Sequence, residues 1–166
     1  MLSPDPFSAF LLSFNSCRPT SCGTLTIASA DPLTPPTIRP NYLSTDHDVE
    51  EAIAGCRLLR KMAATPPLAD VITGEIHPGP EVQTDAELLA DFRHRADTVF
   101  HPVGTCRMGP DARTAVVDAR LRVHGVANLR VIDASVFPTV TSGNTNAPTV
   151  MVAEKGAAML LEDDRA

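Results

Sequence analysis

The 166-residue chain has no tryptophan, a single tyrosine and few basic residues. Its 14 Lys and Arg stand against 20 Asp and Glu, which gives a formal net charge of −6. Nucleic acids and anionic membranes are bound by clustered basic side chains, so we expect neither as a partner. The apolar run at residues 9–12 is far shorter than the roughly 20 residues that a membrane span needs, and it lacks the flanks of a signal peptide.

Cysteine is also sparse, and its four positions follow no regular spacing. Cys17 and Cys22 are the one close pair, and a single C-x4-C pair without a second pair is a poor zinc pattern. A Cys/His zinc protein is therefore disfavoured and no metal is expected. Free thiols in a reducing cytoplasm are the favoured interpretation.

Two helices are predicted in the first half of the chain. Residues 46–64 repeat apolar side chains at helical spacing, with Thr45 or Asp46 as the cap and two prolines beyond the end. Thr84, followed three residues later by Glu87, forms a capping box that opens a second helix through about residue 95.

The strand signals are weaker. Residues 23–29 alternate polar and apolar side chains, as a half-buried antiparallel strand does, and the apolar residues 7–14 could form another strand. Residues 31–40 contain four prolines and are expected to be an extended connection.

In the second half, short strands are expected at residues 121–123 and 129–132, and the latter runs into Asp133. A final helix has Pro148 in its first turn and extends to about residue 162. Its residues are small or apolar on nearly all sides, which predicts deep burial.

Three stretches could carry chemistry: residues 101–109 (HPVGTCRMG), 129–135 (LRVIDAS) and 143–149 (GNTNAPT). His101 is suited to proton transfer near neutral pH, and the start of the final helix offers N–H groups to an anion. Each has a structural alternative. His101 could be a turn or core residue, Asn146 could cap the final helix, and Asp133 could bind neighbouring backbone amides.

The three stretches, in this order and spacing, resemble the C-terminal region of glucose-methanol-choline (GMC) oxidoreductases, and the choline dehydrogenase-like branch in particular. The similarity extends upstream as far as residues 18–23, where Cys22 stands at a position usually held by Arg, and covers nearly the whole chain. The resemblance implies a mixed α+β and α/β fold. Residues 1–97 would be part of an antiparallel-sheet substrate-binding domain, and residues 98–166 would add the last strand and the C-terminal helix of a Rossmann-like FAD-binding domain.

The resemblance also implies an FAD-dependent enzyme that oxidises the CH–OH group of a small primary alcohol, with hydride passing to flavin N5. His101 matches the family's catalytic base, and Asn146 matches a second active-site position that hydrogen-bonds the forming alkoxide. The implied cofactor contacts are Asp133 and Ala134 at the ribityl–pyrophosphate region and Ala147, Pro148 and Thr149 beside the isoalloxazine N1–C2=O edge.

The glycine-rich turn G-x-G-x-x-G, which holds the ADP part of FAD, does not occur in the sequence. We therefore expect a truncated or separately encoded C-terminal part that needs an N-terminal FAD-binding half, on a separate chain, for activity. The alternative is a binding or subunit-interaction module of the same fold that has lost catalysis.

Overall fold

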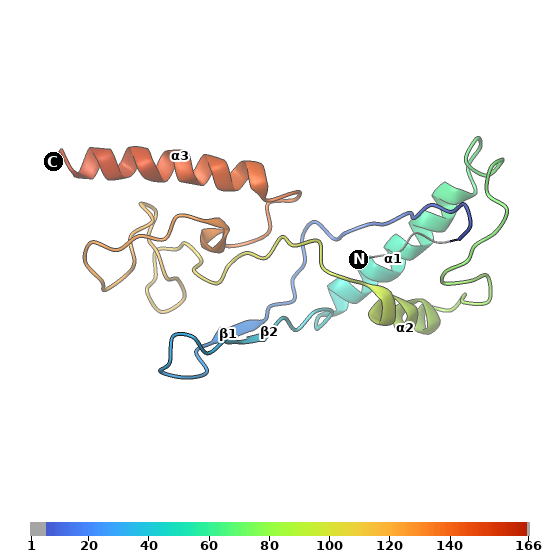
Figure 1. Cartoon of the computed structure of the whole chain (residues 1–166), viewed down its shortest axis with the longest axis horizontal. Helices are drawn as coiled ribbons and strands as arrows, with labels where there is room; N and C mark the ends of the chain where they lie inside the picture. Colours follow the sequence, from blue (N-terminus) through green and yellow to red (C-terminus); the bar gives the residue numbers. More distant parts are fainter. Residues whose placement is uncertain (1–5, 166) are drawn as a thin grey trace. The chain divides into compact units, whose positions relative to one another are not determined.

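The computed structural model describes residues 6–165, which hold three α-helices and a two-stranded antiparallel sheet joined by long loops (Figure 1). The chain divides into two compact units. Unit 1 contains residues 45–96 and the segment that ends at Ser16, and unit 2 contains residues 17–44 and 97–166. Among the described residues no helix has the length and apolar character to cross a bilayer. Within the described residues, all four cysteines are free thiols.

Unit 1 begins its helical part with α1 (Asp46–Ala63), and the predicted helix is confirmed. Thr45 is the N-cap, and its hydroxyl accepts a hydrogen bond from the backbone N–H of Asp48 at 3.4 Å. The first turn carries acidic residues and the last turn carries Arg60 and Lys61. Both ends therefore complement the helix dipole.

The second helix, α2 (Asp85–Arg95), begins at the predicted capping box. The hydroxyl of Thr84 accepts from the N–H of Glu87 at 3.3 Å, and the Glu87 carboxylate accepts from the N–H of Thr84 at 2.9 Å. Two otherwise unpaired N–H groups are thus satisfied, which explains why the helix starts here.

The helices α1 and α2 pack against each other (Figure 1). Ala52 of α1 and Leu88 of α2 are buried. The ring of Phe14 packs on Phe92 with 5.6 Å between the ring centroids. It lies so close to Gly55 that a Cβ there would stand 2.1 Å from the ring. The strand considered for residues 7–14 is wrong: these residues are assigned no strand, and Phe14 at the end of the segment packs on helical residues.

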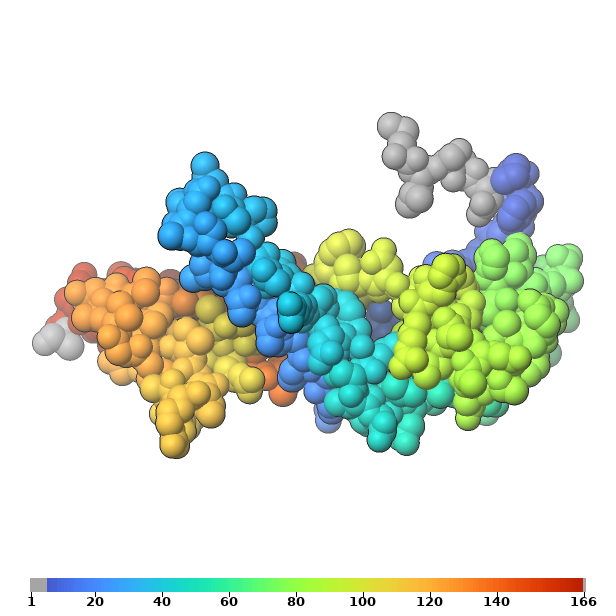
Figure 2. Space-filling view, turned by 90° about the horizontal axis from the view of Figure 1, so that it is seen from below, coloured from blue at the N-terminus to red at the C-terminus, as the bar shows by residue number. Residues whose placement is uncertain are grey.

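In unit 2, β1 (Thr24–Thr26) pairs antiparallel with β2 (Thr37–Arg39), with Leu25 opposite Ile38. The prediction for residues 23–29 holds only for β1, and the expected half-burial is wrong because both strands are exposed. The segment 31–40 is not merely a connection. Its last three residues before Pro40 retain backbone N–H groups and form β2, while the loop between the strands projects as a lobe in Figure 2.

The core of unit 2 forms where α3 (Asn146–Asp163) lies along the loops of residues 103–137 (Figure 1). Val152 and Gly156 are the buried residues of α3. The core cluster of buried side chains consists of Val117, Leu121, Val136, Phe137 and Val152. A Cβ on Gly156 would lie 2.8 Å from Cγ2 of Ile132, so glycine is what permits this close approach.

The predicted deep burial of α3 is wrong. Val150, Met151 and Leu161 keep 55%, 57% and 56% of their surface exposed. These side chains lie on the side of the helix opposite Val152 and Gly156. The described chain covers only one side of this largely apolar helix, so apolar side chains stand exposed on the other side beside the charged Glu154.

The two strands predicted at residues 121–123 and 129–132 are also wrong. These segments form isolated bridges, Val117 with Val123 and Arg122 with Arg130. Leu121 has a φ of 64° and its N–H bonds to the carbonyl of Asp118 at 2.9 Å. A left-handed residue that closes a turn cannot continue an extended strand, so the apolar alternation ends in a loop.

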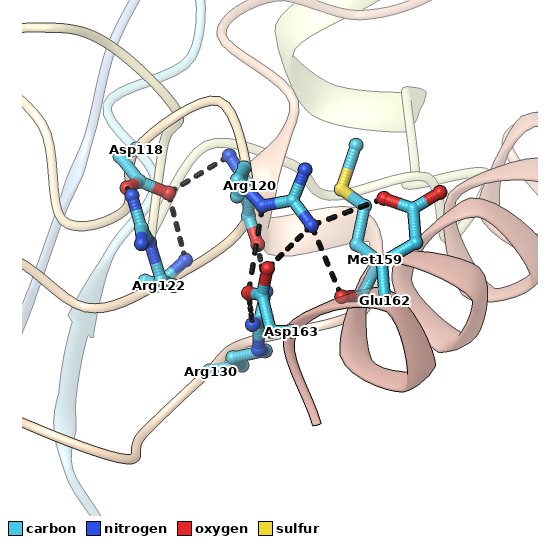
Figure 3. Close-up of polar contacts among 7 residues, drawn as sticks. All are labelled: Asp118, Arg120, Arg122, Arg130, Met159, Glu162 and Asp163. Carbon is cyan, nitrogen blue, oxygen red and sulfur yellow. Dashed lines mark hydrogen bonds and ion pairs between the residues drawn. The ribbon is translucent and has the colours of Figure 1, made fainter. Parts of the chain in front are cut away.

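Four side chains fasten the C-terminal end of α3 to the loops (Figure 3). We call this set, formed by Arg120, Arg130, Glu162 and Asp163, the C-terminal clasp. Arg120 donates to the carbonyl of Met159 at 3.1 Å, to Glu162 at 3.1 Å and to Asp163 at 2.6 Å. Arg130 donates to Asp163 as well. Cations at a helix C-terminus also stabilise its dipole.

Replacement of Gly156 by valine tests the close approach of α3 to the loops. The new side chain would meet the methyl groups of Ile132 and Leu121, and overpacking of this kind costs about 1–3 kcal/mol. Urea unfolding followed by far-ultraviolet circular dichroism measures the loss, with the exposed Ala157→Val as the control. Equal stability of the two variants would contradict the packing described.

Substitution of Asp163 by asparagine tests the clasp. Hydrogen bonds from Arg130 and Arg120 hold the pKa of the Asp163 carboxyl below its ordinary value near 3.8. The carboxylate therefore stabilises the fold above that value, and the stabilisation is lost as the pH falls through the lowered pKa. We expect Asp163→Asn to be less stable than the parent at pH 6 to 7, with the gap closing below about pH 4. The exposed Asp164→Asn is the control, and a gap that does not depend on pH would refute the clasp.

Candidate functional site

The first two candidate stretches lie side by side. The N–H of Cys106 donates to the carbonyl of Ser135 at 3.0 Å, and the N–H of Met108 donates to the carbonyl of Val136 at 2.8 Å. Ser135 and Val136 belong to a short 3-10 helix, η1 (Ala134–Val136). The backbone of residues 104–109 is thereby fixed to the segment that follows Asp133.

The backbone around the histidine adopts uncommon conformations. Gly104 has a φ of 86°, a region that side chains rarely allow. Phe100, directly before His101, has a φ of 60° although it is not glycine, and its side chain is 79% exposed. Left-handed non-glycine residues carry strain and are enriched at functional sites.

A side-chain hydrogen bond joins the first stretch to the third. Nδ1 of His101 lies 3.0 Å from the hydroxyl oxygen of Thr145, across 44 residues of sequence. His101 is half-buried and Thr145 is buried, with 7% of its surface exposed. The histidine is thus held at the N-terminal end of α3.

The first turn of α3 is open to a ligand. Thr145 is the N-cap but makes no side-chain cap bond, and the first turn has no acidic residue. Asn146 is the first helical residue, so the alternative in which it caps the helix is wrong. Asn146 and Ala147 are exposed, while Pro148 and Thr149 are half-buried. The backbone N–H groups and the positive end of the dipole here suit a negatively charged group.

Asp133 has the local role that its sequence position allows. Its side chain accepts from the N–H of Ser135 at 2.7 Å and caps η1. Asp133 is exposed and Ala134 is half-buried, so both can still be reached by a ligand. The hydroxyl oxygen of Ser135 is buried and has no hydrogen-bond partner among the described residues. Such a group is costly unless a water or a ligand satisfies it.

The structure thus brings together the three stretches that hold the predicted site residues. The hydrogen bond between His101 and Thr145 was not predicted, because a threonine before a helix ordinarily indicates a cap. No local pattern indicates a partner 44 residues away.

Other features of unit 2 do not join this site. A hollow of about 420 Å³ lies within the loop between β1 and β2, and none of the candidate residues lines it. Within residues 6–165, no group of three His, Cys, Asp or Glu side chains is placed to hold a metal ion.

Comparison with known proteins places these residues in a family context. The family model described as GMC oxidoreductase matches residues 19–153. An alcohol dehydrogenase [acceptor] from Pseudomonas putida is 48% identical over 143 residues, which cover 86% of this chain and 26% of that protein. A mitochondrial choline dehydrogenase from Mus musculus is 48% identical over 158 residues, which cover 95% of this chain and 26% of the relative.

A solved structure gives the same result. A formate oxidase variant from Aspergillus oryzae RIB40, studied for FAD modification, superimposes with a TM-score of 0.82 at 31% identity. The match covers 87% of this chain and 25% of the oxidase. The chain therefore spans about a quarter of the length of the relatives that it matches.

Two substitutions separate the parts that Asp133 can play. Asp133→Ala removes the cap on Ser135 and should destabilise the chain by about 1 kcal/mol, measured by urea unfolding. Asp133→Asn keeps an acceptor oxygen and should stay close to the parent. If the asparagine variant were as unstable as the alanine variant, the cap would not be what this side chain contributes to stability.

Proposed function

The chain belongs to the GMC oxidoreductase family, and we propose that it forms the catalytic-base side of an FAD-dependent oxidoreductase that acts on the CH–OH group of alcohols. The family and its structural neighbours are FAD-binding flavoproteins. The observation that carries the proposal is the linkage of the three stretches. A backbone hydrogen bond from Cys106 to Ser135 joins the first stretch to the second, and the His101–Thr145 contact joins it to the third.

In this proposal His101 is the base. Its Nδ1 is engaged by Thr145, so Nε2 is the ring nitrogen left to take the proton of the substrate hydroxyl. A neutral imidazole is well matched to this task near neutral pH. Asn146, the first residue of α3, is exposed beside this pair and would donate its side-chain N–H to the alkoxide oxygen as the proton leaves.

FAD, when bound, accepts the hydride and so carries the redox chemistry. The chain's residues fit the flavin end of this cofactor. The uncapped first turn of α3, with Ala147, Pro148 and Thr149, would stabilise negative charge at the N1–C2=O edge. Asp133 and Ala134 would contact the ribityl–pyrophosphate region, where both remain accessible.

The ADP part of FAD needs a binding element from elsewhere, because the sequence has no G-x-G-x-x-G turn. We propose that an N-terminal FAD-binding half, on a separate chain, supplies it. In the assembled protein the C-terminal region described here would complete the Rossmann-like domain with α3. The exposed apolar side chains of α3, such as Val150, Met151 and Leu161, support this proposal because they need a covering surface.

The proposed substrate is a small primary alcohol, since relatives include an alcohol dehydrogenase and a choline dehydrogenase. The free cysteines support a reducing compartment such as the cytoplasm.

The decisive variant is His101→Ala in the complex of this chain with the polypeptide that carries the glycine-rich turn. We expect kcat for dye-linked oxidation of choline or a simple primary alcohol to fall by about 10²- to 10⁴-fold, the usual contribution of a general base. Flavin content, measured from visible absorbance, should not change. His94→Ala, an exposed histidine on α2, is the matched control and should keep full activity.

Two results would contradict the proposal. A complex without flavin would remove its basis. Full turnover in His101→Ala would favour the alternative, an inert binding or subunit-interaction module in which the residues of this chain only complete a fold.

A further inference from the structure

Three helices of this chain start at a threonine, and one of the three threonines behaves differently. Thr45 and Thr84 have extended backbones, and their hydroxyls accept from the N–H three residues on, at 3.4 and 3.3 Å. Thr145 has a helical backbone with φ −84° and ψ −9°, and its side chain makes no cap bond. A threonine cap contributes about 1 kcal/mol to a helix, so α3 forgoes this stabilisation.

The hydroxyl of Thr145 instead forms a hydrogen bond with Nδ1 of His101, which lies 3.0 Å away. We propose that Thr145 is a positioning residue that fixes the ring orientation and the tautomer of His101. The catalytic importance of this positioning rests on the proposed function, because only a catalytic His101 needs one particular ring nitrogen to be free. The hydrogen bond itself belongs to the chain with or without flavin.

The tautomer follows from the chemistry of a base. A neutral imidazole carries its proton on one nitrogen and a lone pair on the other. For Nε2 to accept the substrate proton, Nδ1 must carry the ring proton and donate it to an acceptor. Thr145 Oγ1 is that acceptor, in the way that a second partner commonly orients a functional histidine. When Nε2 takes a proton, the same contact becomes a charge-assisted and stronger hydrogen bond.

Thr145 is itself fixed to α3. Its carbonyl accepts from the N–H of Thr149 at 3.0 Å and from the Thr149 hydroxyl at 2.6 Å. The side chain is also buried, so the hydroxyl has little freedom to rotate away from the histidine. Because Asn146 follows in the chain, Thr145 ties the position of the proposed base to that of the proposed alkoxide donor.

The first test reads the tautomer directly from ¹⁵N NMR of the His101 ring in the 166-residue chain. The parent should show a protonated Nδ1 and a free Nε2 at a pH where the ring is neutral. In Thr145→Val, Nδ1–H loses its acceptor and the Nε2–H tautomer should become populated. Thr145→Ser keeps a hydroxyl and should retain the parent spectrum. Thr145→Ala also lacks the hydroxyl but adds no methyl group, so it shows whether an effect of valine comes from poor fit. Thr84→Val is the matched control at the start of another helix.

The second test is kinetic and uses the FAD-loaded complex. Thr145→Val should lower kcat by about 10- to 100-fold, as expected when a reacting group is misplaced by a fraction of an ångström to an ångström. KM should not change, because substrate binding is left intact. Thr145→Ser should restore kcat, and circular dichroism confirms that each variant is folded.

The outcomes separate this inference from the proposed function. A parent spectrum with Nε2–H, or a Thr145→Val variant with parental ring nitrogens and parental kcat, would overturn the positioning role. If His101→Ala kept full turnover, the proposed function would fail, whereas the tautomer measurement would still report whether Thr145 fixes the ring.

Discussion

The packing of one side of α3 against the loops of residues 103–137 is the constraint on which unit 2 depends. These loops contain only isolated bridges and a short 3-10 helix, so they lack a sheet of their own to hold their shape. Gly156 allows the helix to approach them closely, and Val152 fills the shared core. The clasp fastens the C-terminal end of α3, and the His101–Thr145 contact fastens its start.

This arrangement explains how a loop-rich segment can offer a defined site. The histidine, the uncapped helix start and the segment at Asp133 come from three parts of the sequence. The stretch that holds the histidine is hydrogen-bonded to both of the others. Unit 1 contributes none of these residues. The chemistry proposed for this chain thus depends on a histidine that is held at the start of α3.

The predictability of each element follows from the range of its interactions. The boundaries of α1 and α2 could be predicted because Thr45, Thr84 and Glu87 act within one helical turn. The strands expected at residues 121–123 and 129–132 were wrong because alternation alone does not indicate a left-handed residue. Leu121 takes that conformation where its N–H closes a turn on the carbonyl of Asp118. The apolar composition of α3 could be read from the sequence. The sequence did not indicate which side of the helix would stay exposed.

The candidate site shows the same division. The three stretches were recognisable as motifs, and their contacts agree with a common site. The role of Thr145 was hidden, because its sequence position is that of a cap and its partner is 44 residues away. The burial of the Ser135 hydroxyl without a hydrogen-bond partner could not be predicted either, because burial depends on residues that are distant in the sequence.

The most direct test of the account is a crystal structure of the complete flavoprotein that contains this chain, with FAD bound. We expect the isoalloxazine ring to contact the first turn of α3 and to face His101, with the His101–Thr145 hydrogen bond retained. A flavin bound away from residues 101, 133–134 and 146–149 would contradict it.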